Sequence, residues 1–80
     1  MAQYFSKGGT SGSHLAFETP ANWNTQADGG GSDASSLSGA HLILQADDYM
    51  DLGDNVSCGS LTTQTDSHLT ANNSYVITTT

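Results

Sequence analysis

Cations are almost absent from this sequence. Lys7 is the only Lys or Arg among 80 residues, against eight Asp and Glu, so the formal net charge is −7. Phosphate backbones are bound by clustered Lys and Arg, and anionic membrane surfaces attract the same residues. The scarcity of cations therefore argues against nucleic acid and against a membrane surface as partners.

Long apolar runs and cysteine pairs are missing as well. The chain has no run of about 18 apolar residues, the length that indicates a membrane span. Residues 1–7 lack the apolar segment of a signal peptide. Cys58 is the single cysteine, so no disulfide can form within the chain. A small fold without disulfides is stabilised by oligomerisation, a metal or a larger body.

Core-forming residues are scarce. Leu, Ile, Val and Phe make up 13 of the 80 residues, whereas Ser, Thr, Gly and Asn make up 35. Low apolar content with high net charge is typical of disorder in an isolated chain. We therefore expect one small domain whose order depends on partners.

Short runs of apolar and β-branched residues, separated by Gly, Asn, Asp and Ser, indicate strands and turns. Residues 40–46 form the most apolar window and predict a buried strand, and residues 55–80 predict further strands. Gly59 lies where the apolar positions change face, which predicts a bend or bulge. We predict an all-β fold with short strands and long polar loops, completed by oligomerisation and compatible with a β-solenoid coil.

The chain divides into an N-terminal arm, residues 1–13, and a single β-rich domain, residues 14–80. The arm carries the adjacent aromatics Tyr4 and Phe5, followed by a flexible Gly/Ser segment. We expect the arm to dock on another subunit, for example by adding a strand. A frayed terminus with incidental aromatics is the alternative.

The last strand is a second expected contact. It is rich in Thr and reads as an edge strand that pairs with a neighbour through Tyr75, Val76 and Ile77. The interior is expected to contain the largest apolar side chain and the apolar residues of the other strands, namely Trp23, Leu42, Ile43, Leu44, Val56, Leu61 and Leu69.

Four aspartates within residues 47–54 are candidate metal ligands: Asp47, Asp48, Asp51 and Asp54. Calcium takes six to eight oxygen ligands. The spacing departs from the twelve-residue calcium loop, which needs a central Gly and a closing Glu. A solvated acidic turn is the alternative. If the chain binds a metal, we expect calcium in this turn, and we expect no other cofactor.

Each histidine is followed by leucine, and His14, His41 and His68 are spaced 27 residues apart. A period of 20–50 residues is typical of repeat architectures, and stacked histidines could hold a metal. The rest of the three segments matches poorly, so a chance alignment of three dipeptides is the alternative. Nothing in the sequence supplies the outer hydrogen-bond partners that metal-binding histidines use.

No pattern in the sequence indicates catalysis. Asp66, Ser67 and His68 are contiguous, but neighbouring residues of a strand point to opposite faces and cannot form a proton relay. Cys58 has no nearby cation to lower its pKa, so it reads as a small buried residue. We predict no enzymatic activity.

Several segments resemble β-helical fibre and adhesin proteins. These segments are an Asn-Trp stretch (residues 17–24), a Gly-rich loop, an acidic turn (residues 47–55) and short Ser/Thr-rich coils at residues 59–62 and 68–70. The N-terminal arm without a signal peptide resembles that of tailed-bacteriophage structural proteins. The resemblance covers residues 17–80. It rests on general composition and not on a diagnostic motif, and it carries over no catalytic residue.

The resemblance implies a non-enzymatic component of a viral particle, either a capsid decoration (cement) protein or the base of a fibre. It would stabilise the assembly through contacts with copies of itself, as a trimer, and with other virion proteins such as the major capsid protein. Its location would be the virion, after synthesis in the host cytoplasm. A carbohydrate-binding or adhesin module that uses Trp23 and the acidic turn, with calcium, is the alternative.

Overall fold

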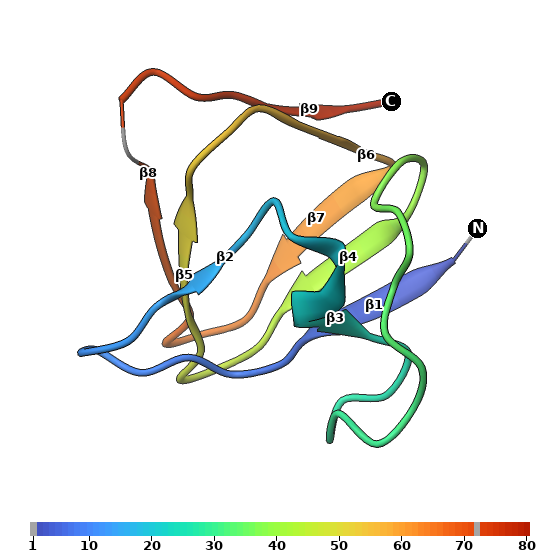
Figure 1. Ribbon diagram of the computed structural model, residues 1–80, viewed down its shortest axis with the longest axis horizontal. Helices are drawn as coiled ribbons and strands as arrows, with labels where there is room; N and C mark the ends of the chain where they lie inside the picture. Colours follow the sequence, from blue (N-terminus) through green and yellow to red (C-terminus); the bar gives the residue numbers. More distant parts are fainter. Residues whose placement is uncertain (1, 72) are drawn as a thin grey trace.

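Nine short strands in three sheets form the described part of the chain. The computed structural model describes residues 2–71 and 73–80. The strands are β1 (Gln3–Ser6), β2 (Leu15–Ala16), β3 (Trp23–Asn24), β4 (His41–Leu44), β5 (Tyr49–Leu52), β6 (Val56–Cys58), β7 (Ser60–Thr63), β8 (His68–Ala71) and β9 (Ile77–Thr79), with one 3₁₀ helix, η1 (Pro20–Asn22). The sheet orders are β3-β1-β4-β7, β2-β5-β8 and β6-β9 (Figure 1). The predicted all-β character is confirmed.

Two successive turns of the chain lie side by side. Strands β4, β5 and β6 form one turn, and β7, β8 and β9 pair with them in parallel and in the same order. His41 lies beside Ser60, and Tyr49 beside His68, both at a spacing of 19 residues. On the other side of the first turn, β1 pairs with β4 and β2 with β5, also in parallel. Each sheet is therefore built from strands of consecutive turns of the chain.

The 27-residue spacing of the His-Leu pairs is not the structural period. His41 belongs to the sheet of β1, β4 and β7, where it faces Ser60. His14 and His68 instead lie on either side of Tyr49, next to a different sheet. His41 therefore lies in a different sheet from the other two, and Tyr49 separates His14 from His68, so the three histidines do not stack on one another.

The core follows the alternation of strand residues between two faces. In β4 and β5 every second residue is buried, and these residues are Leu42, Leu44, Met50 and Leu52. Ile43, which we expected in the core, faces outward and is half-buried, because it lies between two inward residues of one strand. Leu69 faces inward beside Met50, yet it is 37% exposed. It belongs to the last turn, so only the preceding turn covers it.

The N-terminal segment is part of the body of the fold. Strand β1 lies between β3 and β4 in the first sheet, so Phe5 is paired with both Asn24 and Ile43. Tyr4 packs against the core, and Ser6 is only 1% exposed. β4 pairs along one side of β1, and β3 covers the other side at Phe5 and Ser6, so β1 lies inside the sheet. The expected docking arm with Tyr4 and Phe5 is instead a central strand.

Gly59 forms the corner between β6 and β7, where the sequence predicts a bend. A Cβ at this position would lie 2.6 Å from the carbonyl oxygen of Gly39, a contact that real side chains do not make. The backbone N–H of Gly59 donates to the carbonyl of Ala40 at 2.7 Å, which holds the corner against the preceding turn. The close approach of two backbones explains why glycine is needed here.

Candidate interaction surface

The turns of the chain that lie side by side form a stack. Strands β7, β8 and β9 are the last members of their sheets and lie at the same end of this stack (Figure 1). We call these three strands the open end. Within the described residues none of them has a partner on its outer side. Unpaired edge strands present rows of free N–H and C=O groups that another chain can pair with. The open end is therefore the part of the surface best equipped for main-chain recognition.

The opposite edge of the first sheet is covered. Strand β3 pairs antiparallel with β1, placing Asn24 beside Phe5 and Trp23 beside Ser6. The short helix η1 leads directly into β3 and ends where the Trp23 N–H donates to the Pro20 carbonyl. The first sheet thus has one capped edge, at β3, and one free edge, at β7.

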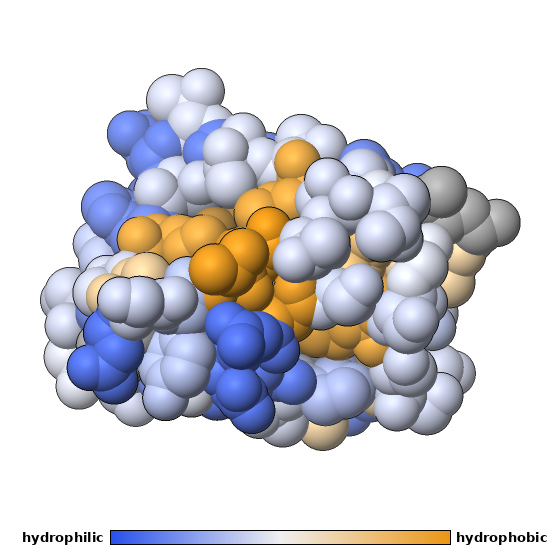
Figure 2. Space-filling view, turned by 90° about the horizontal axis from the view of Figure 1, so that it is seen from above, coloured by the Kyte–Doolittle hydropathy of each residue, from blue (hydrophilic) through white to orange (hydrophobic). Residues whose placement is uncertain are grey.

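The interior of the open end is only partly covered. Leu61 lies beside Leu42 and Ile77 beside Val56, so the last turn continues the rows of core residues. Leu61 and Ile77 are only partly buried, whereas Leu42 is fully buried. Val76, just before β9, is 56% exposed. The face on which β9 lies shows apolar surface at its centre, surrounded by polar residues (Figure 2).

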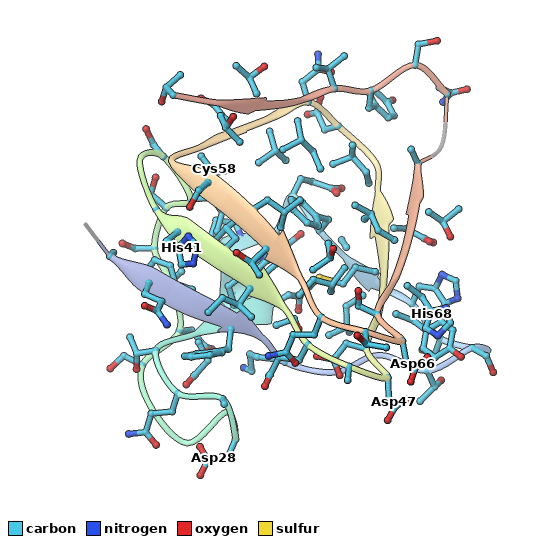
Figure 3. All side chains as sticks on the ribbon, turned by 180° about the vertical axis from the view of Figure 1, so that it is seen from behind. Asp28, His41, Asp47, Cys58, Asp66 and His68 are labelled. Carbon is cyan, nitrogen blue, oxygen red and sulfur yellow. The ribbon has the colours of Figure 1, made fainter. Side chains whose placement is uncertain are left out.

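Three aromatic rings form a row beside the sheet of β2, β5 and β8. The ring centroids of His14 and Tyr49 lie 5.3 Å apart, and those of Tyr49 and His68 lie 4.0 Å apart with parallel planes. The Nδ1 atom of His14 is 2.6 Å from an Oδ1 atom of Asp51, which anchors the first ring. His68 is the exposed last ring of the row and belongs to the open end (Figure 3).

The expected contact residues divide between the interior and the open end. Tyr75 packs against the core with part of its surface, Val76 is exposed, and Ile77 begins the edge strand β9. Of the three, only Ile77 lies in the edge strand, and the other two precede it. Tyr4 and Phe5 belong to the central strand β1 and contribute nothing to this edge.

The expected acidic turn contains strand β5, and three of its four aspartates have separate partners. Asp48 accepts a hydrogen bond from the Ser6 hydroxyl, Asp51 contacts His14, and Asp54 accepts from the Asn55 N–H. Asp47 lies at a corner with a φ of 65°. Across residues 2–71 and 73–80, no three His, Cys, Asp or Glu side chains converge as a metal site. The expected calcium ligands are therefore not brought together.

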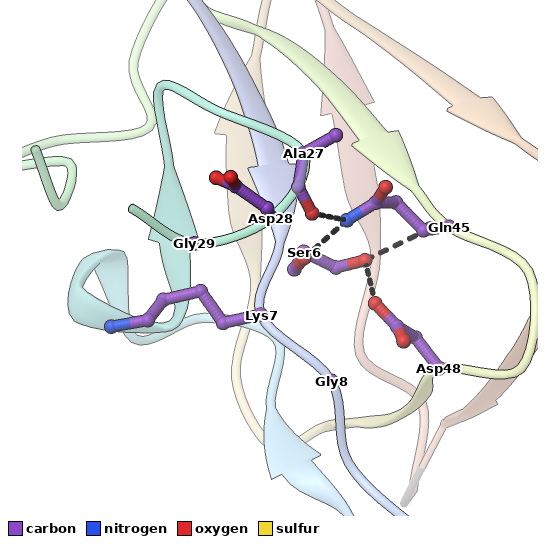
Figure 4. Close-up of a pocket in the computed structure, with 8 residues that line it drawn as sticks. All are labelled: Ser6, Lys7, Gly8, Ala27, Asp28, Gly29, Gln45 and Asp48. Carbon is purple, nitrogen blue, oxygen red and sulfur yellow. Dashed lines mark hydrogen bonds between the residues drawn. The ribbon is translucent and has the colours of Figure 1, made fainter. Parts of the chain in front are cut away.

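A polar pocket of about 130 Å³ lies between β1, the end of β4 and the Gly-rich loop (Figure 4). Gln45 donates from Nε2 to the carbonyls of Ser6, at 2.7 Å, and Ala27, at 2.8 Å. Ligand pockets usually enclose about 300–1,000 Å³. The pocket is smaller than this range, and its polar groups are already bonded to one another. These hydrogen bonds hold the loop against the sheet.

An ion pair fixes the far side of the same loop. Lys7 Nζ lies 2.8 Å from Asp33 Oδ1, and the Asn24 side-chain amide donates to the same oxygen. The hydrogen bond from Lys7, followed by that from Asn24, lowers the pKa of the Asp33 carboxyl. The only Lys or Arg of the chain is thus used to hold the loop.

Trp23 is inaccessible to a ligand. Its side chain is fully buried, its Nε1 donates to the Phe17 carbonyl at 2.8 Å, and its ring meets that of Phe17 edge-on at 5.0 Å. A sugar ring needs an exposed aromatic face to stack on. Trp23 therefore offers no face on which a sugar could stack.

Cys58 should be protected from thiol reagents in the folded protein. Its side chain is fully buried, and burial raises the pKa of the thiol, so the reactive thiolate is rare near pH 8. We expect reaction with Ellman's reagent to be at least tenfold slower in buffer than in 6 M guanidinium chloride. The double variant C58S/S57C, which moves the thiol to the exposed neighbour, is the matched control and should react fast. Equal rates for the two proteins in buffer would contradict the burial.

Comparisons of the chain with protein-family models, with curated proteins and with solved structures found no match. In the part of the chain that the structure describes, no helix is long and apolar enough to span a membrane.

The sequence does carry one signal of the stacked turns that the His-Leu spacing obscures. At a shift of 19 residues, Leu42, Gln45 and Asp47 recur as Leu61, Gln64 and Asp66. The two glutamines lie next to equivalent corners, and the two aspartates both have a left-handed φ, of 65° and 67°. The N–H of Asp47 donates to the carbonyl of Asp66.

Proposed function

We propose that this chain is a non-enzymatic structural module, a capped segment of a parallel β-solenoid that joins a larger assembly through its open end. The observation that carries the proposal is the alignment of three free strand edges at one end of the stack, over a partly covered apolar interior. Strand addition at such edges uses main-chain hydrogen bonds for affinity and side-chain contacts for specificity.

The asymmetry of the two ends supports this role. Stacked repeat structures need a terminal cap, because an uncapped end exposes interior residues to water. Here β3 and η1 cap one end, whereas Leu61, Leu69 and Ile77 at the other end lack full cover. A unit capped at one end and open at the other is suited to begin or terminate a longer stack.

We further propose that the assembly is a viral particle and that the chain acts at the base of a fibre. The basis is the resemblance of residues 17–80 to β-helical fibre proteins and of the N-terminal segment to structural proteins of tailed bacteriophages. Strand pairing at the open end would extend the structure along the stack axis, which suits a fibre better than a decoration protein lying flat on a shell. The partners are copies of the chain and other virion proteins.

The side-chain contacts favour a structural role over a catalytic one. The Ser6 hydroxyl bonds to Asp48, and Ser60 contacts His41, but these pairs belong to different parts of the first sheet. Neither pair has the third group of a nucleophile, base and carboxylate relay among its hydrogen bonds. The first bond instead ties β1 to the turn between β4 and β5, and the second ties β7 to β4.

The test is incorporation into particles. Virions purified from infected host cells, analysed by quantitative mass spectrometry, should contain the chain at a fixed ratio to the major capsid protein. A chain carrying proline at the free edges of β7 and β9 should fold but be depleted from particles by at least tenfold. Recovery of the unmodified chain only in the fraction free of particles would overturn the proposal.

A further inference from the structure

We propose that the open end binds the open end of a second copy of this chain, giving a dimer with two-fold symmetry. The inference rests on the proposed function in that it uses the same surface, and it names the first partner of that surface. It follows from which strand edges are free, from the direction of the strands and from the distribution of charge.

The cap on β1 blocks a head-to-tail arrangement in the largest sheet. In such a stack the last turn of one copy would have to pair with the first turn of the next. The outer edge of β1 is already paired with β3, which runs antiparallel to it. The largest sheet therefore has no free edge at that end, so among its described strands only β7 offers its outer edge to a second copy.

Bringing two open ends together requires a rotation of 180° about an axis perpendicular to the stack. This rotation reverses the direction of the strands, so the new pairs are antiparallel, a pattern slightly more stable per residue than the parallel one. With the axis through β8, this strand pairs with its own copy, and β7 pairs with β9 of the second copy. Leu61, Leu69 and Ile77 of each chain then cover those of the other and complete the core.

The charge distribution favours this face over the rest of the surface. Seven of the eight acidic residues lie in residues 1–59, and residues 60–80 contain only Asp66. Like charges on two identical molecules repel, and the chain has a single cation to offset them. Two copies therefore meet with the least repulsion where their last turns face each other.

An interface of this kind closes on itself. Each copy contributes the same surface to a two-fold contact, so the free edges of β7, β8 and β9 are all used and this contact joins two chains only. The geometry thus favours a dimer of the isolated chain, where the sequence led us to expect a trimer. A three-fold axis does not bring two last turns face to face. In a trimer the free edges of β7, β8 and β9 would therefore have no antiparallel partner strands from another copy.

The free edges can be blocked without breaking the existing sheets. Gln64 and Thr80 donate their N–H groups to the carbonyls of Leu44 and Cys58, at 2.9 and 3.0 Å. N–H groups alternate in direction along a strand, so those of Thr63 and Thr79 point away from the neighbouring strand. Proline is tolerated in an edge strand at such positions. The variant T63P/T79P therefore removes two donors from the open end only.

Sedimentation equilibrium of the purified full chain tests the proposal. The wild type should have the mass of a dimer, and T63P/T79P that of a monomer, with at least tenfold weaker association and an unchanged circular dichroism spectrum. The control is T65P, which places proline at the second position of the turn closed by the Ser67 N–H and the Gln64 carbonyl, and it should remain a dimer.

A second variant tests the position of the axis without depending on proline. In C58S/T70C the introduced thiol lies on the outer face of β8, beside Asp51 in the register. Two such thiols should lie close together at the axis and give a disulfide-linked dimer on mild oxidation. C58S/Q26C, with an exposed thiol on the distant loop, should not.

The outcomes separate this inference from the proposed function. A monomeric or trimeric wild type, a dimer that survives T63P/T79P, or a C58S/T70C protein that does not cross-link would overturn the two-fold dimer. If the wild type is monomeric but its incorporation into particles still depends on the free edges, the structural role stands with another partner. If it dimerises but is absent from particles, the dimer stands and the virion role fails.

Discussion

Replacement of Leu42 by alanine should lower the free energy of unfolding by about 2–5 kcal/mol. Leu42 is fully buried at the centre of β4, between β1 and β7, so the truncation leaves a cavity that the paired strands on both sides cannot close. A domain of this size has a small total stability. We therefore expect L42A to be largely unfolded, as measured by guanidinium denaturation followed by circular dichroism.

Leu69→Ala is the matched control, because it is the same chemical change at an inward position of the last turn. Leu69 is 37% exposed, so its truncation should cost the monomer less than about 1.5 kcal/mol. The comparison should be made in the T63P/T79P background, in which association does not contribute. Equal losses for L42A and L69A would contradict the difference in cover between the two turns.

Replacement of Gly9 by alanine should be the most damaging single-methyl addition, lowering stability by about 3 kcal/mol or more. Gly9 has a φ of +99°, which side chains disfavour. A Cβ there would also overlap the carbonyl oxygen of Tyr49 and lie 3.1 Å from its carbonyl carbon. Because the obstacle is backbone in β5, it cannot be relieved by rotating a side chain.

Gly8→Ala separates the two causes. Gly8 also has a positive φ, +123°, but an added Cβ would meet no atom within 4 Å. G8A should therefore show only the conformational penalty, about 1–2 kcal/mol. Thermal or chemical denaturation of both variants measures the difference. If G9A were no less stable than G8A, the close approach of residue 9 to β5 would be refuted.

The local patterns of the sequence were enough to predict the fold class and some of its details. The apolar window at residues 40–46 contains β4, and the change of face at Gly59 coincides with a corner. Both features depend on neighbours in the sequence, namely alternation and backbone freedom. The same reasoning predicted a final edge strand over residues 75–80, within which the structure has β9 at Ile77–Thr79.

Features that depend on distant residues were not predicted. Tyr4 and Phe5 looked like a free arm because nothing near them in sequence can pair with them, and their partners lie in β3 and β4. Ile43 looked like core because it lies between two leucines, and only the strand geometry shows that it points the other way. The acidic turn looked like one cation site because its aspartates are close in sequence, although their partners lie in different strands.

The pairing of β1 with β4 also determines when the fold can form. Phe5 lies beside Ile43, so during synthesis the first strand has no parallel partner until the chain has grown by nearly forty residues. Contacts over such separations form slowly, because a long loop must close before any hydrogen bond is gained. During synthesis the last turn emerges after the strands it pairs with, so it can add to them strand by strand. Folding during synthesis should therefore proceed from the capped end outward, and the edges of β7, β8 and β9, which form last, are those left for a partner.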